Sequence, residues 1–220
     1  MKIGGFLKNS FIDYKNNISC VVFVTNCNMN CYYCHNKHLL NNNQKELINE
    51  NEIFDFLQTR KGFIDAVVIS GGEPTLQKDL IEFIKKIKSL NYKVKLDTNG
   101  TNFEVVKSLI EQNLIDYVAM DIKGPISKYN EIVGNNFKIS EVKKTIEFLK
   151  QNKIDYEFRT TFCSKLSVND IEEIAIFLGN VRAYYIQKCN EEDSKQSNED
   201  LLLAQKVAKK HIENVFIRGV

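Results

Sequence analysis

The sequence lacks the features that mark exported and membrane-embedded chains. It has no run of 18 apolar residues, which a membrane-spanning helix needs. The first ten residues, MKIGGFLKNS, contain no apolar core of the kind found in a secretory signal. The 30 basic and 28 acidic residues leave a net charge of +2, which makes no case for nucleic acid or a membrane as the main partner. We therefore expect a cytosolic protein whose six cysteines serve as reduced thiols, metal ligands or catalytic groups rather than as a disulfide framework.

Half of these cysteines stand in one short polar stretch, TNCNMNCYYCHNK at residues 25–37. Cys27, Cys31 and Cys34 have the spacing C-x3-C-x2-C, and soft thiolate ligands suit zinc or an iron–sulfur cluster. A structural zinc site has four protein ligands and no open position, whereas three cysteines leave one position open. His35 directly follows Cys34, and adjacent residues rarely converge on one ion. The spacing therefore favours a cubane cluster with one iron free to bind something else, with structural zinc as the alternative.

Short strand-like runs alternate with amphipathic segments along nearly the whole chain, which predicts an α/β fold with a parallel sheet. The expected strands are 19–25, 64–70, 92–97, 115–121, 154–162 and 183–188. The expected helices lie near 45–60, 78–90, 102–113, 139–152 and 168–179, with a last C-terminal helix near 197–214. Even spacing without a linker predicts a single domain over 1–220. Both a doubly wound open sheet and a partial (β/α) barrel fit this pattern.

Unusual residues collect just after the expected strands, which is where both folds place their functional groups. These stretches are the cysteine loop at 26–36, SGGEP at 70–74, DTNG at 97–100, MDIKG at 120–124 and QKCN at 187–190. We therefore expect the five stretches to contribute to one site.

These residues resemble a known family. The spacing of the cysteines, with Tyr33 before the last one, resembles the signature of radical S-adenosylmethionine (SAM) enzymes, and GGEP at 71–74 resembles their second signature. The first 36 residues are similar to the start of glycyl-radical-enzyme activating proteins, most of all to that of anaerobic ribonucleoside-triphosphate reductase. The resemblance covers most of residues 1–190. It implies a partial (β/α)6 TIM-like barrel and a [4Fe-4S] cluster whose open iron binds SAM, with cluster ligands Cys27, Cys31 and Cys34.

The resemblance also implies which residues contact SAM. Gly71 and Gly72 would admit its methionine part, because neither has a Cβ, and Glu73 or Ser70 would meet its ammonium group. Tyr33 and His35 would contact the adenine, and Lys123 would contact the carboxylate of SAM. Arg159 and Gln187 would contact the carboxylate or the adenine. Asp97, Thr98 and Asn99 would contact the cofactor and, in some relatives, a monovalent cation.

Asp121 and Lys123 are separated by one residue of an expected strand, so both side chains point to the same face. An aspartate and a lysine facing a barrel interior would be costly without partners, and a zwitterionic cofactor supplies both signs. Structural alternatives remain open. They are a salt bridge between Asp121 and Lys123, an Asn-Gly turn at Asn99, a loop cap at His35, and internal hydrogen bonds at Arg159 and Gln187.

The implied mechanism needs a one-electron donor, flavodoxin or ferredoxin, that reduces the cluster. Reductive cleavage of SAM then gives a 5′-deoxyadenosyl radical, which takes hydrogen from a glycine of a partner enzyme. A pyruvate formate-lyase-type activating enzyme and a radical SAM enzyme acting on a small molecule are alternatives. A non-enzymatic iron–sulfur or zinc protein is an alternative of a different class.

No cysteine lies between Cys34 and Gly71, and no cysteine cluster follows in the C-terminal region, so a single cluster is expected. Cys163 and Cys189 are isolated and are predicted to be structural. The chain also departs from its family. Where relatives often have DYPG, residues 13–16 are DYKN, and we expect the proline-glycine turn to be lost.

Overall fold

The computed structural model describes residues 1–40, 47–134, 139–189 and 196–219. Its strands are β1 (Ile3–Ser10), β2 (Ser19–Val24), β3 (Ala66–Gly71), β4 (Lys93–Thr98), β5 (Tyr117–Asp121), β6 (Asp155–Phe162), β7 (Tyr184–Lys188) and β8 (Val215–Arg218). Its α-helices are α1 (Glu50–Thr59), α2 (Leu80–Ser89), α3 (Phe103–Glu111), α4 (Tyr129–Val133), α5 (Ser140–Gln151), α6 (Val168–Leu178) and α7 (Asn198–Ala208). Short 3-10 turns are η1 (Lys37–Leu39), η2 (Pro74–Leu76) and η3 (Ile126–Lys128).

The strand order follows the chain order, from β1 to β8. β1 pairs antiparallel with β2, whereas β2 with β3, β3 with β4, β6 with β7 and β7 with β8 are parallel pairs. A helix lies between each two consecutive strands from β2 onward, as crossover connections require. The expected α/β class with a mostly parallel sheet is confirmed.

The chain divides into two compact units. Unit 1 comprises Met1–Asn28, Asn36–Thr98 and Asn102–Val118, and unit 2 comprises Met29–His35, Asn99–Thr101 and Ala119–Val220. The single domain expected over 1–220 stays a prediction. None of the helices in the described ranges is both long and apolar enough to cross a lipid bilayer.

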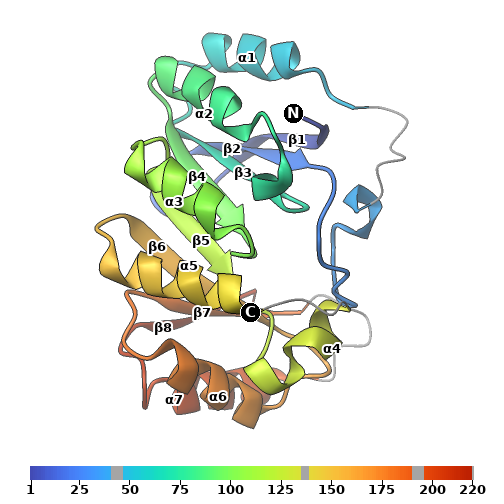
Figure 1. Cartoon of the computed structure of the whole chain (residues 1–220), viewed down its shortest axis with the longest axis vertical. Helices are drawn as coiled ribbons and strands as arrows, with labels where there is room; N and C mark the ends of the chain where they lie inside the picture. Colours follow the sequence, from blue (N-terminus) through green and yellow to red (C-terminus); the bar gives the residue numbers. More distant parts are fainter. Residues whose placement is uncertain (41–46, 135–138, 190–195, 220) are drawn as a thin grey trace. The chain divides into compact units, whose positions relative to one another are not determined.

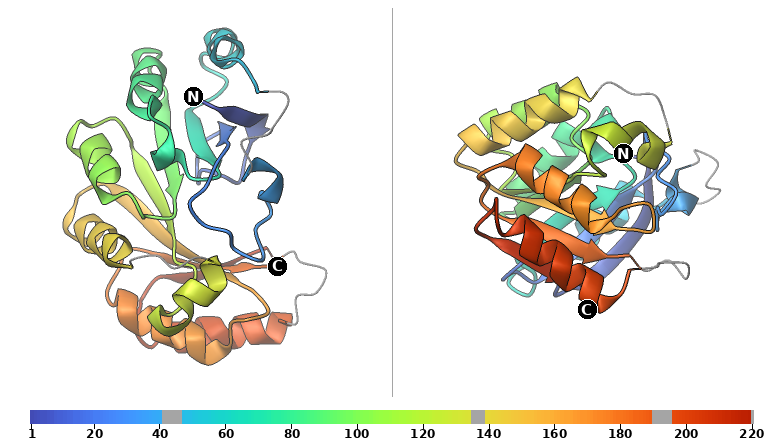
Figure 2. Two further views of the ribbon diagram at one scale, coloured as in Figure 1. Left: turned by 45° about the vertical axis from the view of Figure 1, so that its right-hand side comes forward. Right: turned by 90° about the horizontal axis from the view of Figure 1, so that it is seen from below.

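Unit 1 is built on β2, β3 and β4, most of whose residues are buried. α2 and α3 lie on the same side of β3 and β4 (Figures 1 and 2). The expected helix near 78–90 is α2, and its Phe83, Ile84 and Ile87 are buried at helical spacing. α1 begins in a capping box in which Asn49 and Glu52 satisfy each other's backbone amides.

Unit 2 packs α6 and α7 side by side (Figure 2). The C-terminal helix expected near 197–214 begins at Asn198 but ends at Ala208, so its predicted end was wrong. Residues 215–218 form β8 instead, in parallel register with β7. Gln205 Nε2 donates to the carbonyl of Val215 at 2.8 Å, and the Tyr184 amide donates to that of Asn214 at 2.9 Å. These contacts favour a strand over another helical turn.

β1 was not expected from the sequence, and a turn over residues 14–17 joins the β1–β2 hairpin. The Asn17 amide donates to the Tyr14 carbonyl at 3.1 Å, and Asn16 has φ 61°. This is the left-handed conformation that glycine adopts most readily and asparagine tolerates. The expectation that the turn is lost was therefore wrong, because Asn16 replaces glycine at the position that needs positive φ.

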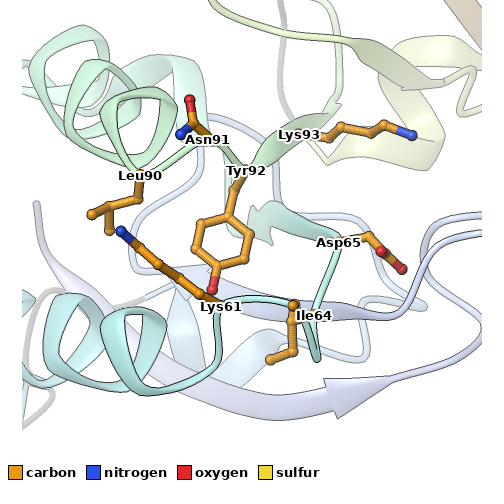
Figure 3. A pocket seen from close by; sticks show the side chains of 8 residues that line it. Lys61, Ile64, Asp65, Leu90, Asn91, Tyr92 and Lys93 are labelled. Atoms are coloured by element: carbon orange, nitrogen blue, oxygen red, sulfur yellow. The ribbon is translucent and has the colours of Figure 1, made fainter.

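A pocket in unit 1 lies just before β3 and β4, at the amino ends of these strands (Figure 3). The predicted site residues of unit 1 lie at the carboxyl ends of the same strands. The side chains of Lys61 and Lys93 extend in opposite directions in Figure 3, so their charges do not converge. We therefore assign no function to this pocket, which is lined by Lys61, Gly62, Ile64, Asp65, Leu90, Asn91, Tyr92 and Lys93.

Candidate cofactor site

In unit 1, the GGEP loop is bonded directly to the start of the cysteine loop. The Gly72 amide donates to the Val24 carbonyl, and the Glu73 amide donates to the Asn26 carbonyl, both at 2.8 Å. An added Cβ would lie 2.0 Å from the Asn26 oxygen at Gly72 and 2.5 Å from the Val24 nitrogen at Gly71. The two glycines are therefore required by backbone contact with the residues that lead into Cys27. Whether they also admit the methionine part of SAM stays a prediction.

The cysteine loop, residues 26–36, contributes to both units. Cys27 is half-buried and belongs to unit 1, whereas the buried Cys31 and the half-buried Cys34 belong to unit 2. In unit 2 the Asn30 amide donates to the Val133 carbonyl at 2.8 Å, which anchors the loop to the end of α4. Over the described residues, no three His, Cys, Asp or Glu side chains are grouped so as to hold a metal ion. The convergence of the three thiols on one cluster therefore stays a prediction.

Burial raises the pKa of the Cys31 thiol, and the Lys123 ammonium acts in the opposite direction on the same pKa. Cluster ligation requires the thiolate, so metal binding must displace the proton that burial favours. The Lys123 charge lowers the cost of forming the Cys31 thiolate, which a ligand cysteine requires.

Glu73 is fully buried and is held by two threonine hydroxyls. Thr75 Oγ1 donates to Glu73 Oε1 at 2.6 Å, and Thr98 Oγ1 donates to the same oxygen at 2.8 Å. The Thr75 amide also donates to Oε1 at 3.1 Å, so Glu73 caps η2. The carboxylate thus joins the GGEP loop to the end of β4, where Thr98 was a predicted site residue.

Asp97 lies at the end of β4 with protein groups at both carboxylate oxygens. Ser70 Oγ donates to Oδ2 at 3.2 Å, and the Lys95 ammonium lies 3.3 Å from Oδ1 as an ion pair rather than an aligned hydrogen bond. The Ser70 hydroxyl is therefore bonded to Asp97, and its predicted contact with the ammonium group of SAM stays a prediction. Lys95 was missed at the sequence level, although Lys95 and Asp97 share one face of the strand by simple alternation.

In unit 2, Asp121 forms an ion cluster with two cations. Lys123 Nζ lies 3.0 Å from Asp121 Oδ2, and Arg159 Nε donates to Oδ1 at 2.7 Å. Asp121 is half-buried, and the loss of hydration would raise its pKa, but the attraction of Arg159 and Lys123 outweighs this and lowers the pKa below the usual range. The Asp121 charge raises the Lys123 pKa well above normal despite burial. The Asp121–Lys123 salt bridge and an internal hydrogen bond at Arg159, both considered as structural alternatives, are thus present.

The Tyr33 phenol interacts electrostatically with Lys123 and Asp121 of this cluster. The side chain is 5% exposed, and its hydroxyl has no hydrogen-bond partner among the described residues. Burial raises the pKa of this phenol well above normal. A buried hydroxyl without a partner is costly, so a polar ligand atom in contact with Tyr33 would relieve that cost.

Tyr32 was missed at the sequence level, yet it anchors the cysteine loop of unit 2. Its hydroxyl accepts a hydrogen bond from the Lys165 amide at 2.9 Å, and the Lys165 ammonium lies 4.9 Å from the ring centre. Its only sequence signal was its place beside Tyr33, and the partner loop after β6 lies 133 residues away in the chain.

The remaining predicted residues are Asn99, His35 and Gln187. Asn99 Oδ1 accepts from the amide and hydroxyl of Thr101, at 3.0 and 2.6 Å, so this side chain forms the turn considered as its alternative. His35 is exposed. Gln187 is half-buried on β7, in register with Thr161. Contacts of His35, Asn99 and Gln187 with SAM stay predictions.

Three observations test whether the residues fit a cluster and SAM. The buried Cys31 has a cation close by, Tyr33 carries an unsatisfied buried hydroxyl, and a partly exposed cluster of one carboxylate and two cations lies around Asp121. Thiols suit iron, and mixed charges suit a zwitterion. The residues of unit 2 therefore fit these cofactors.

Comparisons with known proteins agree. The family model described as the Radical SAM superfamily matches residues 21–178. A Methanocaldococcus jannaschii protein to which a glycyl-radical enzyme activating function is ascribed is 40% identical over 237 residues, covering 99% of this chain and 96% of that one. A Pyrococcus horikoshii protein to which GTP 3′,8-cyclase activity is ascribed is 32% identical over 160 residues, 71% of this chain and 50% of that one.

Among solved structures, Streptococcus suis SuiB bound to S-adenosylmethionine aligns at a TM-score of 0.66 with 16% identity, over 90% of this chain and 48% of that chain. This likeness concerns the fold alone, and it confirms the expected partial-barrel class. The chain belongs to the radical SAM superfamily and is an enzyme of that class. Membership implies a [4Fe-4S] cluster and SAM. Within the superfamily, the match to the Methanocaldococcus jannaschii protein extends over nearly the full length of both chains.

Proposed function

We propose that this chain is an activating enzyme that generates a glycyl radical in a partner enzyme. The observation that carries the proposal is the 40% identity to a relative with that ascribed function, over 99% of this chain and 96% of the relative. No other match described above covers both chains to this extent.

In this proposal, Cys27, Cys31 and Cys34 hold the cluster. When bound, the cluster and SAM supply the radical chemistry of the superfamily, and the chain orients them and keeps water away. Lys123 would release part of its pairing with Asp121 to bind the carboxylate of SAM. Arg159 would keep Asp121 ionised and in place, because its hydrogen bond to Oδ1 does not involve the oxygen that Lys123 uses.

Tyr33 would donate its hydroxyl to a polar atom of the bound cofactor, in keeping with the lack of a protein partner. Gly71, Gly72 and Glu73 would shape the opening for the methionine part, since the loop that carries them is bonded to Val24 and Asn26. Asp97 and Thr98, at the end of β4, would also contribute to binding SAM.

The finer assignment is that the partner is anaerobic ribonucleoside-triphosphate reductase, with flavodoxin or ferredoxin as the electron donor. It rests on the resemblance of the first 36 residues to that group of activating proteins. A pyruvate formate-lyase-type partner remains the nearest alternative. We also propose that the chain works in the cytoplasm, where its thiols stay reduced.

A second candidate is a radical SAM enzyme that acts on a small molecule. The match to the Pyrococcus horikoshii protein favours it, but that match leaves half of that relative uncovered. The same residues would bind the cluster and SAM in both cases, so only the substrate differs.

The deciding experiment has two stages under anaerobic conditions. The chain is first reconstituted with iron and sulfide, reduced with dithionite and supplied with SAM, and 5′-deoxyadenosine is measured. It is then mixed with purified anaerobic ribonucleoside-triphosphate reductase or pyruvate formate-lyase, and the glycyl radical is detected by electron paramagnetic resonance. A glycyl radical signal in one partner supports the proposal and names the partner. A parallel reaction contains GTP in place of a partner enzyme. Consumption of GTP with formation of 5′-deoxyadenosine there, and no radical signal in either partner, would favour the second candidate. Zinc uptake without iron would overturn both.

A further inference from the structure

A buried lysine with no role in the proposed function lies beside Asp97. The Lys95 side chain is 3% exposed, and its ammonium lies 3.3 Å from Asp97 Oδ1. It also donates a hydrogen bond to the Asp13 carbonyl and lies 5.8 Å from the centre of the Tyr117 ring. A buried ammonium group is costly unless it is paired, so these contacts are what make a charged Lys95 tolerable.

We propose that Lys95 supplies the positive charge that a monovalent metal cation would otherwise bring to Asp97, so that SAM binding by this chain requires no such cation. The inference rests on the SAM site of the proposed function. It departs from the resemblance only in the monovalent cation, which Asp97, Thr98 and Asn99 meet in some relatives in addition to SAM.

The first reason is that the Asp97 carboxylate is already occupied. Ser70 donates to Oδ2 at 3.2 Å, and Lys95 neutralises Oδ1. A metal cation at this carboxylate would face the ammonium across a few ångströms. Like charges repel far more strongly in a buried site than in water, so the ammonium excludes the metal.

The second reason is that the neighbouring oxygen donors are also occupied. The Thr98 hydroxyl donates to Glu73 at 2.8 Å, and Asn99 Oδ1 accepts two hydrogen bonds from Thr101. The end of β4 therefore does not fit a monovalent metal cation, because its carboxylate already has a cationic side chain beside it and the neighbouring side-chain oxygens are engaged.

β4 also offers a matched control. Lys93 lies two residues before Lys95 on the same face of the strand, but it is exposed and pairs with Asn17 Oδ1 at 3.0 Å. Replacing Lys93 removes the same charge from the same strand without touching Asp97. Any effect specific to Lys95 is therefore an effect of the charge beside that carboxylate.

The primary test measures the dissociation constant of SAM for the anaerobically reconstituted wild-type protein. The buffers contain sodium, potassium or tetramethylammonium chloride at equal ionic strength. We expect the three constants to agree within about twofold. Tightening by about tenfold or more in sodium or potassium, which is the usual size of a coupled binding effect, would overturn the proposal.

The variant test repeats these measurements on Lys95→Met. We expect SAM to bind this variant about tenfold more weakly in tetramethylammonium and to regain affinity in sodium or potassium, because a metal cation can now take the vacated position. Lys93→Met should behave like wild type, and Lys95→Arg should stay independent of the metal cation. A folded Lys95→Met protein that binds SAM like wild type in all three salts would overturn the proposal.

Lys95→Met could fail to fold, so a further measurement uses the wild-type chain before reconstitution. A cation that binds only the folded state raises the unfolding midpoint. We expect the same midpoint in all three salts, and a rise specific to sodium or potassium would overturn the inference. None of these readouts requires a glycyl radical partner, so they separate this inference from a failure of the proposed function.

Discussion

The Gly72 Cα lies so close to Asn26 that an added Cβ would come within 2.0 Å of the Asn26 carbonyl oxygen. The same oxygen accepts a hydrogen bond from the Glu73 amide at 2.8 Å. The carboxyl end of β3 and the residue preceding Cys27 are thus one hydrogen-bonded structure, and substitutions in GGEP act on the cysteine loop as well as on the loop that contains them.

Gly72→Ala should therefore disturb the approach to Cys27. We expect it to lower the free energy of unfolding by about 1–3 kcal/mol, as overpacking does, and to reduce the iron retained after reconstitution. Gly62→Ala is the control. Gly62 has positive φ, at 82°, but nothing lies within 4 Å of an added Cβ. It should cost about 1 kcal/mol through backbone strain and leave iron retention unchanged. Equal iron content in both variants would contradict the coupling. Urea denaturation and iron analysis provide the measurements.

Cys31→Ala should abolish SAM cleavage while leaving a folded chain, because it removes one of three predicted cluster ligands. The assay is 5′-deoxyadenosine formation after anaerobic reconstitution, with circular dichroism to confirm folding. Cys20→Ala is the matched control, since Cys20 is also buried but lies within β2, outside the cysteine loop. It should keep its cleavage activity at some cost in stability. Retained cleavage by Cys31→Ala would disprove the ligand assignment.

Tyr33→Phe should have opposite effects in the two states of the protein. Without cofactors, removing a buried hydroxyl that lacks a partner should raise the free energy of unfolding by about 1 kcal/mol. With cofactors bound, losing a hydrogen bond should weaken SAM binding by about tenfold. Tyr32→Phe provides the contrast, because it loses the bond from the Lys165 amide and should destabilise the cofactor-free chain by about 1 kcal/mol. If Tyr33→Phe destabilises the cofactor-free chain as well, its hydroxyl has a protein partner.

The lowered pKa of Asp170 implies that the free energy of unfolding of unit 2 depends on pH. Burial would raise its pKa, but Lys128 and Ser167 together hold that pKa below its ordinary value of 3.8. A lowered folded-state pKa means that the stabilisation is fully present above pH 3.8 and is lost as the pH falls through the lower folded value.

We expect Asp170→Ala to be less stable than wild type by about 1–2 kcal/mol at pH 7, since it also breaks the capping box of α6. The difference between the two proteins should shrink as the pH is lowered below 3.8. Thermal unfolding across that range measures it. A difference that stays constant down to the acid end would show that the Asp170 charge contributes nothing.

The strands and helices that could be predicted from the sequence are those whose local spacing of apolar residues is enough to specify them. α2 lies within one or two residues of its expected bounds, because its apolar residues recur at helical spacing. β8 was missed because Val207, Ala208, His211 and Val215 continue a helical spacing, and only pairing with β7 makes residues 215–218 a strand. β1 was missed because its stability comes from antiparallel pairing with β2, which local pattern does not reveal.

The residues of the candidate site likewise fall into those that the sequence identifies and those that only the structure identifies. Motif spacing and position after strands pointed to the cysteines, the GGEP loop and the Asp121–Lys123 pair. The partners of these residues depend on strand register and on loops far apart in the chain. The contacts of Arg159 with Asp121 and of Tyr32 with Lys165 are therefore visible only in the folded chain, whereas strand alternation alone puts Lys95 and Asp97 on one face.

Asn16 shows what the turn before β2 demands of its sequence. The requirement is a backbone with φ near 61° and a bond from the Asn17 amide to the Tyr14 carbonyl, and DYKN meets it without proline or glycine. A letter-by-letter signature built on DYPG would exclude this chain, whereas one written in allowed backbone conformations would include it. Searches for distant members of such families gain reach when the third turn position accepts asparagine, because the physical constraint lies in a dihedral angle and not in a residue name.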